Sequence, residues 1–350
     1  MKHSLIALSI AFLTTAAKAA VEYHDIKTSD GTVIQTCAQF PDSTQFPGTR
    51  PAIMINWGSG LYDYCRDRTF QSPAAKALVA RGVIVFSNLK RGIRHNPKDN
   101  TFTTDLTVAR SADISHIKSD ALEAFNFYTH DQRINSKKMA AWGGSEGTIV
   151  STFIALHHPD LAELDLSSTM IEDFPTLYAR QMYEILPQLL LQMFDKESKG
   201  ELTKDELTDS FLISGGLDSF DVIDTNHDEV VTEQELSADI KRVISHSLKN
   251  GNDTFFLSDL GGKVTANWVN SMLKQNPLAP QILSLKMQVY MQHGTADQST
   301  SIQPVYELQN EVLQQHKSNF HFHYYQGLDH ELSADVIWSI ITSIGDRLLK

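Results

Sequence analysis

One serine lies in a sequence context that can make it a nucleophile. Ser145 is the centre of a G-x-S-x-G pattern at residues 143–147, between the apolar run Met139–Trp142 and a helix-compatible segment, 149–158. A sharp strand-to-helix turn of this kind lifts the serine hydroxyl out of the sheet, where a base can reach it. The pattern also occurs by chance in ordinary glycine-rich turns, so the rest of the chain must support the interpretation.

A nucleophilic serine needs a base to take its proton and a carboxylate to orient that base. Asp297 follows the apolar run 287–291, and His330 follows the β-prone run 319–325. Both therefore occupy loops just beyond predicted strands, in the chain order serine, acid, histidine. We predict that Ser145, Asp297 and His330 form a catalytic triad.

Two rivals for these roles are weaker. Asp329 adjoins His330 in the sequence, and a neighbouring residue rarely reaches the imidazole Nδ1. His293 precedes the acid in the chain, which is the wrong order for this arrangement. A simpler interpretation also remains, because an aspartate after a strand is often a helix N-cap and the chain has 14 histidines.

Acyl transfer also needs donors for the developing oxyanion. The backbone N–H of Glu146, directly after the nucleophile, is one expected donor. The other is expected from the glycine-rich loop 57–61, which follows the strand-like run 52–56. Glycines let this backbone approach the oxyanion closely, so Ser59 or Gly60 is the candidate donor.

The elements that must position these residues alternate between strands and helices. A hairpin is expected at the start of the chain, and near-continuous apolar runs indicate buried parallel strands. This alternation predicts an α/β fold, with a doubly wound, mostly parallel sheet covered by helices on both faces. The expected strands are 21–27, 32–40, 52–56, 83–87, 139–142, 164–168, 287–291 and 319–325, and the expected helices include 72–81, 112–129, 304–316 and 332–349.

The alternation stops near Glu172 and resumes near Lys286. Residues 172–285 are helix-rich and contain no strong strand, so we expect a helical lid inserted into a core of residues 20–171 and 286–350. Such an insertion would lie over the carboxyl ends of the strands, where open α/β sheets bind ligands.

Several of these motifs together resemble the α/β-hydrolase superfamily, and most closely its serine esterases and peptidase-like hydrolases. The resemblance covers roughly residues 21–168 and 286–350. It departs at three positions, where Leu61 replaces a proline, Tyr64 stands near the usual arginine and Gly144 replaces the histidine of the G-H-S-E-G pattern. It implies hydrolysis of a carboxylic ester, thioester or amide of a small acyl substrate without a catalytic cofactor. The motifs are Gly58-Ser59-Gly60, Lys90-Arg91-Gly92, Gly144-Ser145-Glu146-Gly147, His293-Gly294-x-x-Asp297 and Gly327-x-x-His330.

The predicted lid contains a strongly acidic stretch with a metal-binding pattern. Residues 195–239 hold 14 Asp and Glu against three Lys, and residues 224–235 resemble the 12-residue calcium loop of an EF-hand. Glu229 stands where glycine normally makes the sharp turn, which is expected to weaken binding by about 1 kcal/mol. The predicted Ca²⁺ ligands are Asp224, Asn226, Asp228, the Val230 carbonyl, Thr232 and Glu235.

A second loop of the same length, at residues 195–206, is the expected partner of the first. It has Gly200 at the turn, but Lys199 brings an ammonium group to a ligand position. We therefore expect this loop to bind weakly or only to support the other. Its candidate ligands are Asp195, Glu197, Glu201 and Glu206.

Composition limits the possible partners and the compartment. A net charge of −12 over 350 residues argues against nucleic acid, which needs clustered Lys and Arg. Residues 1–19 have the pattern of a secretory signal peptide, and no apolar run is long enough for a membrane span. We thus expect an exported, periplasmic or secreted protein. Cys37 and Cys65 either form one disulfide or remain free, and the sequence leaves oligomeric state open.

The sequence therefore predicts an exported serine hydrolase that acts through an acyl-enzyme, with an ester as the first choice of substrate. Two alternatives remain: a peptidase-type amide hydrolase, and a calcium-binding protein that keeps a hydrolase scaffold without turnover.

Overall fold

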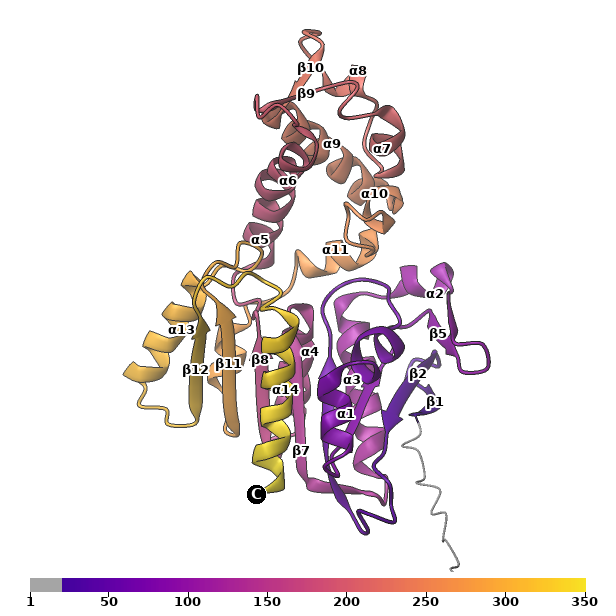
Figure 1. The fold of residues 1–350 in the computed structure, drawn as a ribbon, viewed down its shortest axis with the longest axis vertical. Coiled ribbons are helices and arrows are strands. Elements are labelled where there is room, and N and C mark those ends of the chain that lie inside the picture. Colours follow the sequence, from indigo (N-terminus) through magenta and orange to yellow (C-terminus); the bar gives the residue numbers. More distant parts are fainter. Residues whose placement is uncertain (1–20) are drawn as a thin grey trace, which may run out of the picture.

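An eight-stranded sheet forms the centre of the fold (Figure 1). The computed structural model describes residues 21–350, so the predicted signal peptide at residues 1–19 lies outside the described residues. The strands lie in the order β1-β2-β4-β3-β7-β8-β11-β12. Their bounds are β1 (Val21–Lys27), β2 (Val33–Gln39), β3 (Arg50–Asn56), β4 (Ile84–Asn88), β7 (Ile134–Gly144), β8 (Glu163–Ser167), β11 (Gln288–Gly294) and β12 (Phe320–Tyr325).

Most neighbouring strands are parallel. Only β2 runs antiparallel to its neighbours, pairing with β1 in the predicted hairpin and with β4 on its other side. The inner strands β3 and β4 are almost wholly buried, which explains their continuous apolar sequences. The predicted α/β class with a mostly parallel sheet is confirmed.

Helices cover both faces of the sheet, and each face has its own apolar core. The helices α1 (Pro73–Val79) and α14 (Ala334–Leu349) pack on one face through residues such as Leu78 and Ile344. The helices α3 (Ile114–Thr129), α4 (Glu146–His157) and α13 (Gln303–Gln314) cover the other face.

Some short elements were not expected from the sequence. They include η1 (Cys65–Phe70) before α1, and a small hairpin, β5 (Ile93–Asn96) and β6 (Thr101–Thr104), which is followed by α2 (Leu106–Ser111). The helix predicted over 112–129 begins later because Asp113 is its N-cap and accepts the N–H of His116. An N-cap aspartate satisfies an otherwise unpaired N–H of the first turn, which sets this boundary.

Between β8 and β11 the chain leaves the sheet and forms a separate lobe (Figure 1). The lobe is mainly helical, but it also contains a short antiparallel strand pair in which Leu202 faces Val231. Its elements are α5 (Phe174–Arg180), η2 (Gln181–Ile185), α6 (Leu186–Phe194), β9 (Glu201–Thr203), α7 (Asp209–Ser214), α8 (Phe220–Ile223), β10 (Val230–Thr232), α9 (Glu233–Asn250), α10 (Thr254–Leu257), α11 (Ala266–Met272) and α12 (Ala279–Leu283).

Within residues 21–350, no helix combines the length and the apolar character needed to cross a membrane.

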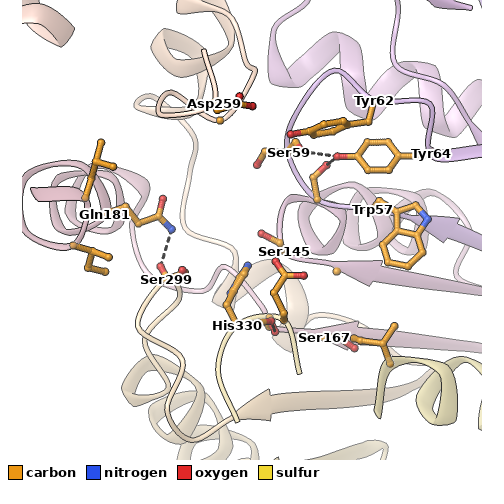
Figure 2. Close-up of a pocket in the computed structure, with 18 of the residues that line it drawn as sticks. Trp57, Ser59, Tyr62, Tyr64, Ser145, Ser167, Gln181, Asp259, Ser299 and His330 are labelled. Atoms are coloured by element: carbon orange, nitrogen blue, oxygen red, sulfur yellow. Dashed lines mark hydrogen bonds between the residues drawn. The ribbon is translucent and has the colours of Figure 1, made fainter. Parts of the chain in front are cut away.

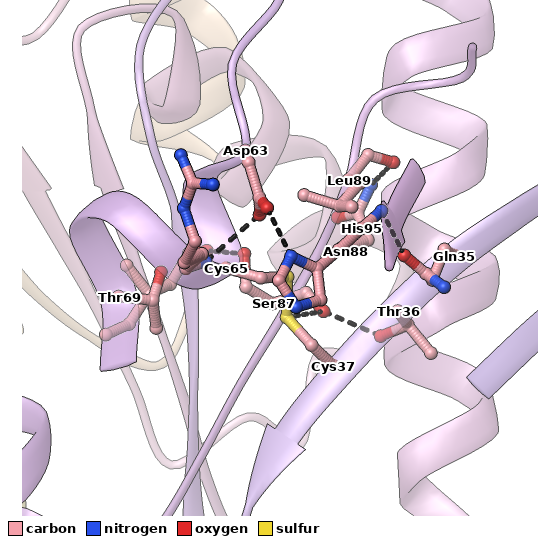
Figure 3. Close-up of a disulfide and its surroundings, with 12 residues drawn as sticks. Gln35, Thr36, Cys37, Asp63, Cys65, Thr69, Ser87, Asn88, Leu89 and His95 are labelled. Carbon is pink, nitrogen blue, oxygen red and sulfur yellow. Dashed lines mark hydrogen bonds and ion pairs between the residues drawn. A yellow bond between two sulfur atoms is a disulfide. The ribbon is translucent and has the colours of Figure 1, made fainter. Parts of the chain in front are cut away.

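Cys37 and Cys65 form a disulfide, so the alternative of two free thiols is excluded (Figure 3). Cys37 lies on β2 and Cys65 begins η1, and both side chains are completely buried. Next to the bridge, the buried Asp63 accepts a 2.7 Å hydrogen bond from Nδ1 of His95. The segment after β3 is therefore tied to the sheet by a covalent bond and by a buried polar pair.

We expect the paired replacement Cys37→Ala and Cys65→Ala to lower the free energy of unfolding by about 3–4 kcal/mol. The bridge closes a loop whose ends are 28 residues apart, and its loss gives the unfolded chain more conformational freedom. Urea unfolding with and without a reducing agent checks this, with the double variant as the control that should not respond to reductant. A urea midpoint of the double variant equal to that of the oxidised unaltered protein would contradict the prediction.

Candidate active site

Ser145 occupies a strained turn between β7 and α4. Its backbone has φ of 54° and ψ of −121°, a conformation that non-glycine residues rarely adopt. A Cβ at Gly147 would lie 2.0 Å from the Asn56 carbonyl oxygen, and one at Gly143 would lie 2.2 Å from the Gly147 oxygen. The two glycines of the pattern are therefore required by close backbone approach, and the local geometry is that of the predicted turn.

Asp297 and His330 come together beyond the ends of β11 and β12. Nδ1 of His330 lies 2.9 Å from Oδ2 of Asp297. Thr300 holds the same carboxylate, because its backbone N–H donates to Oδ1 over 2.8 Å and its hydroxyl donates to Oδ2 over 2.7 Å. The imidazole is therefore oriented by an acid that is itself fixed from two directions.

The electrostatics of this pair favour a charged imidazole and a charged carboxylate. Burial opposes the cationic form of His330, but the hydrogen bond and the negative charge of Asp297 outweigh it and raise the pKa of His330 above its usual value. Burial likewise opposes the ionised form of Asp297, yet its bonds to His330 and Thr300 lower the pKa of the Asp297 carboxyl. Asp297 thus remains ionised while His330 has a strengthened affinity for a proton.

Of the two rivals, His293 also lies against the acid, with its Nε2 3.4 Å from Oδ2 of Asp297, but it is buried and does not line the pocket that holds Ser145. His293 is buried behind Asp297, where its Nε2 contacts the Thr300 carbonyl oxygen at 2.9 Å. Burial, the largest effect, lowers the pKa of His293. The carboxylate of Asp329 accepts the backbone N–H of Glu331 rather than a bond from His330. Neither arrangement offers a substitute for the Asp297–His330 pair.

Backbone contacts fix the loop that carries His330. The hydroxyl of Ser168 donates to the His330 carbonyl oxygen over 2.6 Å. Gly294 allows the acid loop and the histidine loop to cross, because a Cβ there would lie 2.3 Å from the Leu328 carbonyl oxygen. Both loops are thereby held at the same edge of the sheet.

Ser145 and His330 line one large pocket at this edge, and Figure 2 draws their side chains beside each other. The pocket has a volume of about 490 Å³. One wall comes from η2 and α6 of the insertion and carries Met182, Ile185 and Leu186. Asp259 and Glu331 also line it, whereas no Lys or Arg of the described residues does.

The insertion is tied to the loop that carries the acid. The side-chain amide of Gln181 donates to the Ser299 carbonyl oxygen over 2.8 Å (Figure 2). The guanidinium of Arg180 donates to the carbonyl oxygens of Gln298 and Ser299 and pairs with Glu172. The apolar wall of the pocket is thus anchored to the segment between Asp297 and Thr300.

The predicted oxyanion loop lies against Ser145, but its two candidate donors, Ser59 and Gly60, line different cavities. A Cβ at Gly58 would lie 3.2 Å from Cβ of Ser145, so the backbone here almost touches the serine. Ser59 lines the large pocket, whereas Gly60 lines a separate cavity of about 20 Å³. Glu146 is the first residue of α4, and its side chain is completely buried beneath the site.

The two acidic loops of the insertion have the same internal bonding. In the loop 224–235, the carboxylate of Asp224 accepts the N–H of Glu229, and Glu235 accepts the N–H groups of Thr225 and Thr232. In the loop 195–206, Asp195 and Glu206 accept the N–H groups at the matching positions: Gly200, Lys196 and Thr203.

Their backbones match as well. Glu229 has φ of 70° and Gly200 has φ of 80°, the left-handed turn expected at this position of an EF-hand loop. The strands β9 and β10 join the two loops side by side. Lys199 forms an ion pair with Glu197, one of the predicted ligands of the weaker loop.

The metal-ligand predictions stay predictions. Across residues 21–350, no group of three or more His, Cys, Asp or Glu side chains is arranged to hold an ion. The side-chain amide of Asn226 instead donates to Asp228 over 2.9 Å. The loops share the backbone form of the predicted site, while their ligand side chains bond to backbone and to each other.

Sequence reasoning missed Thr300 and Ser168, and it named Tyr64 and Lys90 only within motifs, with no role assigned. Thr300 holds Asp297, and Ser168 holds the His330 backbone. Tyr64 and Lys90 both bond to the oxyanion loop. Lys90 was noticed only as part of a motif, and its position directly after an apolar strand, β4, was the only available signal.

The chain was compared with protein-family models and with curated proteins, and neither comparison found a match. Solved structures match it over most of its length. An α/β hydrolase, GrgF from Penicillium sp. sh18, has a TM-score of 0.54 at 15% identity, covering 94% of this chain and 96% of that one. A lipase in its open form has a TM-score of 0.50 at 14% identity, with coverages of 94% and 99%.

A puromycin-hydrolyzing peptidase of Mycobacterium tuberculosis is also similar, with a TM-score of 0.54 at 11% identity. The match covers 97% of this chain but only 40% of the peptidase. At such low identities these likenesses concern the fold, and they place the sheet with its flanking helices among known hydrolase architectures.

Proposed function

We propose that this chain, whose fold is that of the α/β-hydrolases, is an exported serine hydrolase that cleaves a carboxylic ester. The observation that carries the proposal is the 2.9 Å contact between Asp297 and His330, together with the pocket that both His330 and Ser145 line. The strained backbone of Ser145 supports it, because such strain collects at functional sites.

In the proposed reaction, the Ser145 hydroxyl attacks the acyl carbon while Nε2 of His330 takes its proton. Asp297 holds the imidazole in the required tautomer and stabilises the imidazolium that forms. The backbone N–H groups of Glu146 and Ser59 donate hydrogen bonds to the oxyanion of the tetrahedral intermediate. His330 then protonates the leaving group. In the second half of the reaction, His330 takes a proton from a water molecule that attacks the acyl carbon, and it returns this proton to Ser145 as the acyl group leaves.

The pocket favours an uncharged or cationic substrate with an apolar acyl part. Its wall of Met182, Ile185 and Leu186 offers apolar surface to an acyl chain, and burial of such a chain contributes about 0.8 kcal/mol per methylene. Glu331 would repel an anionic substrate, whereas the charge of Asp259 is paired with Lys263 over 2.8 Å. An amide or thioester could use the same machinery, so a peptidase-type activity is the alternative within this class.

Export is supported by the disulfide. Disulfides such as Cys37–Cys65 form and persist mainly in oxidising compartments, which agrees with the predicted signal peptide at residues 1–19. We therefore propose a periplasmic or secreted location.

Labelling with a fluorophosphonate tests the proposal directly, because this reagent reacts with an activated serine. The alternative of a calcium-binding protein without turnover predicts no labelling and no ester hydrolysis. A panel of short- and long-chain p-nitrophenyl esters with aminoacyl amides separates the esterase from the peptidase.

We further propose that the loop 224–235 binds Ca²⁺ as a structural ion. Asp224, Asn226, Asp228, Glu235, the Val230 carbonyl and Thr232 would supply the oxygen ligands that this ion prefers. The matched backbone of the two loops supports the fit, since Glu229 already adopts the left-handed turn despite its Cβ. The bound ion would offset the mutual repulsion of the acidic side chains.

Millimolar Ca²⁺ is expected to raise the melting temperature of the protein by several degrees. At millimolar Ca²⁺, about tenfold above a Kd of the extracellular type (~10⁻⁴ M), binding stabilises the folded state by about 1.4 kcal/mol. Glu235→Gln should abolish this rise. Glu206→Gln is the matched control, because it removes the same charge at the same position of the weaker loop. Equal melting curves of the unaltered protein in Ca²⁺ and in EGTA would contradict the proposal.

A further inference from the structure

Two side chains donate hydrogen bonds to the carbonyl oxygens of the oxyanion loop. Nζ of Lys90 lies 2.9 Å from the Gly58 carbonyl oxygen. The hydroxyl of Tyr64 reaches both the Gly58 oxygen, at 3.0 Å, and the Ser59 oxygen. A phenol has one hydrogen to donate and an ammonium has three. Lys90 can therefore satisfy the Gly58 oxygen while Tyr64 donates to the Ser59 oxygen. Figure 2 shows the Tyr64 hydroxyl pointing to Ser59.

These bonds determine where the amide hydrogens of the loop point. The peptide bonds of the described residues are trans, and in a planar trans peptide the C=O and N–H directions are opposite. The Ser59 N–H therefore points away from Lys90. Gly58 is in near contact with Ser145, and Ser59 lines the pocket, so this hydrogen is directed to the side where the oxyanion would form.

Lys90 also contacts the other half of the predicted oxyanion site. Its Nζ lies 2.8 Å from Oε1 of Glu146, whose backbone N–H is the second expected donor. The Glu146 side chain is completely buried and that of Lys90 is only 11% exposed. Without the lysine, a buried carboxylate would stand close to the developing negative charge and would oppose it.

We propose that Lys90 and Tyr64 are positioning residues of the oxyanion loop. Lys90 orients the Ser59 N–H toward the oxyanion and cancels the charge of Glu146, while Tyr64 fixes the Ser59–Gly60 peptide that follows. This inference rests on the proposed serine hydrolase function. It assigns the two residues an effect on the transition state, because their polar groups hold the backbone of the oxyanion loop; Lys90 does not line the pocket, whereas the ring of Tyr64 does.

The test compares Tyr64→Phe with the pair Lys90→Met and Glu146→Gln. The paired replacement is used because Lys90→Met alone leaves a buried, unpaired carboxylate and can prevent folding. We expect kcat for a p-nitrophenyl ester to fall about 10-fold for Tyr64→Phe and about 100-fold for the pair, since a misdirected oxyanion donor loses part or all of its effect. KM should change less than about threefold.

Two further measurements separate positioning from general damage. Binding of a trifluoromethyl ketone, which forms a tetrahedral adduct with an oxyanion, should weaken in step with kcat. The acid limb of the pH profile, which reports His330, should not move. Matched controls are Tyr324→Phe, which loses a hydroxyl bonded to Gln309, and Lys138→Met, which loses an ammonium bonded to the Leu348 carbonyl oxygen. Both should retain full activity.

The outcomes distinguish this inference from the function beneath it. If the unaltered protein neither turns over esters nor reacts with fluorophosphonate, the proposed function fails and the positioning role fails with it. If the unaltered protein is active and the folded variants keep its kcat, or show a change in KM alone, the positioning role alone is wrong.

Discussion

Ser145→Ala is expected to reduce kcat for p-nitrophenyl esters by about 10⁶-fold, the loss typical of removing the nucleophile of a serine triad. The alanine has no group that can attack the acyl carbon, while His330, Asp297 and the oxyanion donors remain in place. The same variant should not react with a fluorophosphonate, and peptide mapping of the labelled protein should find the modification on Ser145.

Ser115→Ala is a suitable control because this serine is exposed on α3, away from the pocket. It should keep full turnover and full labelling. Retention of activity by Ser145→Ala would remove the proposed mechanism, whatever the behaviour of the other variants.

Asp297→Asn is expected to lower kcat by about 10⁴-fold, as the loss of the orienting carboxylate does in such triads. The carboxylate now accepts from Nδ1 of His330 and from Thr300. An amide NH₂ facing Nδ1 would favour the tautomer that places the ring hydrogen on Nε2, where it cannot accept the serine proton. Steady-state kinetics at several pH values measure both the loss and its cause.

The pKa of His330 also predicts the direction in which activity changes with pH. His330 must be neutral to act as the base, and Asp297 raises its pKa. Activity of the unaltered protein should therefore fall as the pH drops through a value above the usual imidazole pKa of about 6.5. Without the carboxylate charge the pKa of His330 falls, so the remaining activity of Asp297→Asn should persist to lower pH.

Asp329→Asn is the matched control, because it removes the same charge next to His330 in the sequence. Its carboxylate bonds to the Glu331 N–H, so the change should leave kcat nearly unaltered. If Asp329→Asn were the damaging change and Asp297→Asn the harmless one, the assignment of the orienting acid would be wrong.

Local sequence determined the elements that carry the site. Apolar runs predicted the buried strands, and the turn chemistry of residues 28–31 predicted the β1–β2 hairpin. The glycines around Ser145 predicted the strained turn, because close backbone approach leaves no space for a side chain there. Short elements such as β5 and η1 were missed, since four to six residues carry too little periodicity to be recognised.

Sequence order was enough to nominate Asp297 and His330, but it could not show what holds them. Thr300 became part of the site only because the loop after β11 turns its hydroxyl and its N–H toward one carboxylate. The pocket likewise depends on how the inserted lobe meets the sheet, through contacts such as Gln181 with Ser299. No local pattern encodes either encounter.

Residues that are distant in the chain met only through the order of the strands. Lys90 follows β4 and Glu146 follows β7, and only β3 lies between these two parallel strands. The segments that follow the three strands therefore meet at the same edge of the sheet, where Lys90 and Glu146 form an ion pair. Cys37 and Cys65 became a bridge, not two free thiols, for a similar reason. Hydrophobic periodicity reports which face of an element is buried, whereas the partners of a buried charge or thiol depend on which elements become neighbours. The sequence by itself therefore nominated the candidate residues and determined the elements that carry them, and the tertiary structure alone decided which side chains support them.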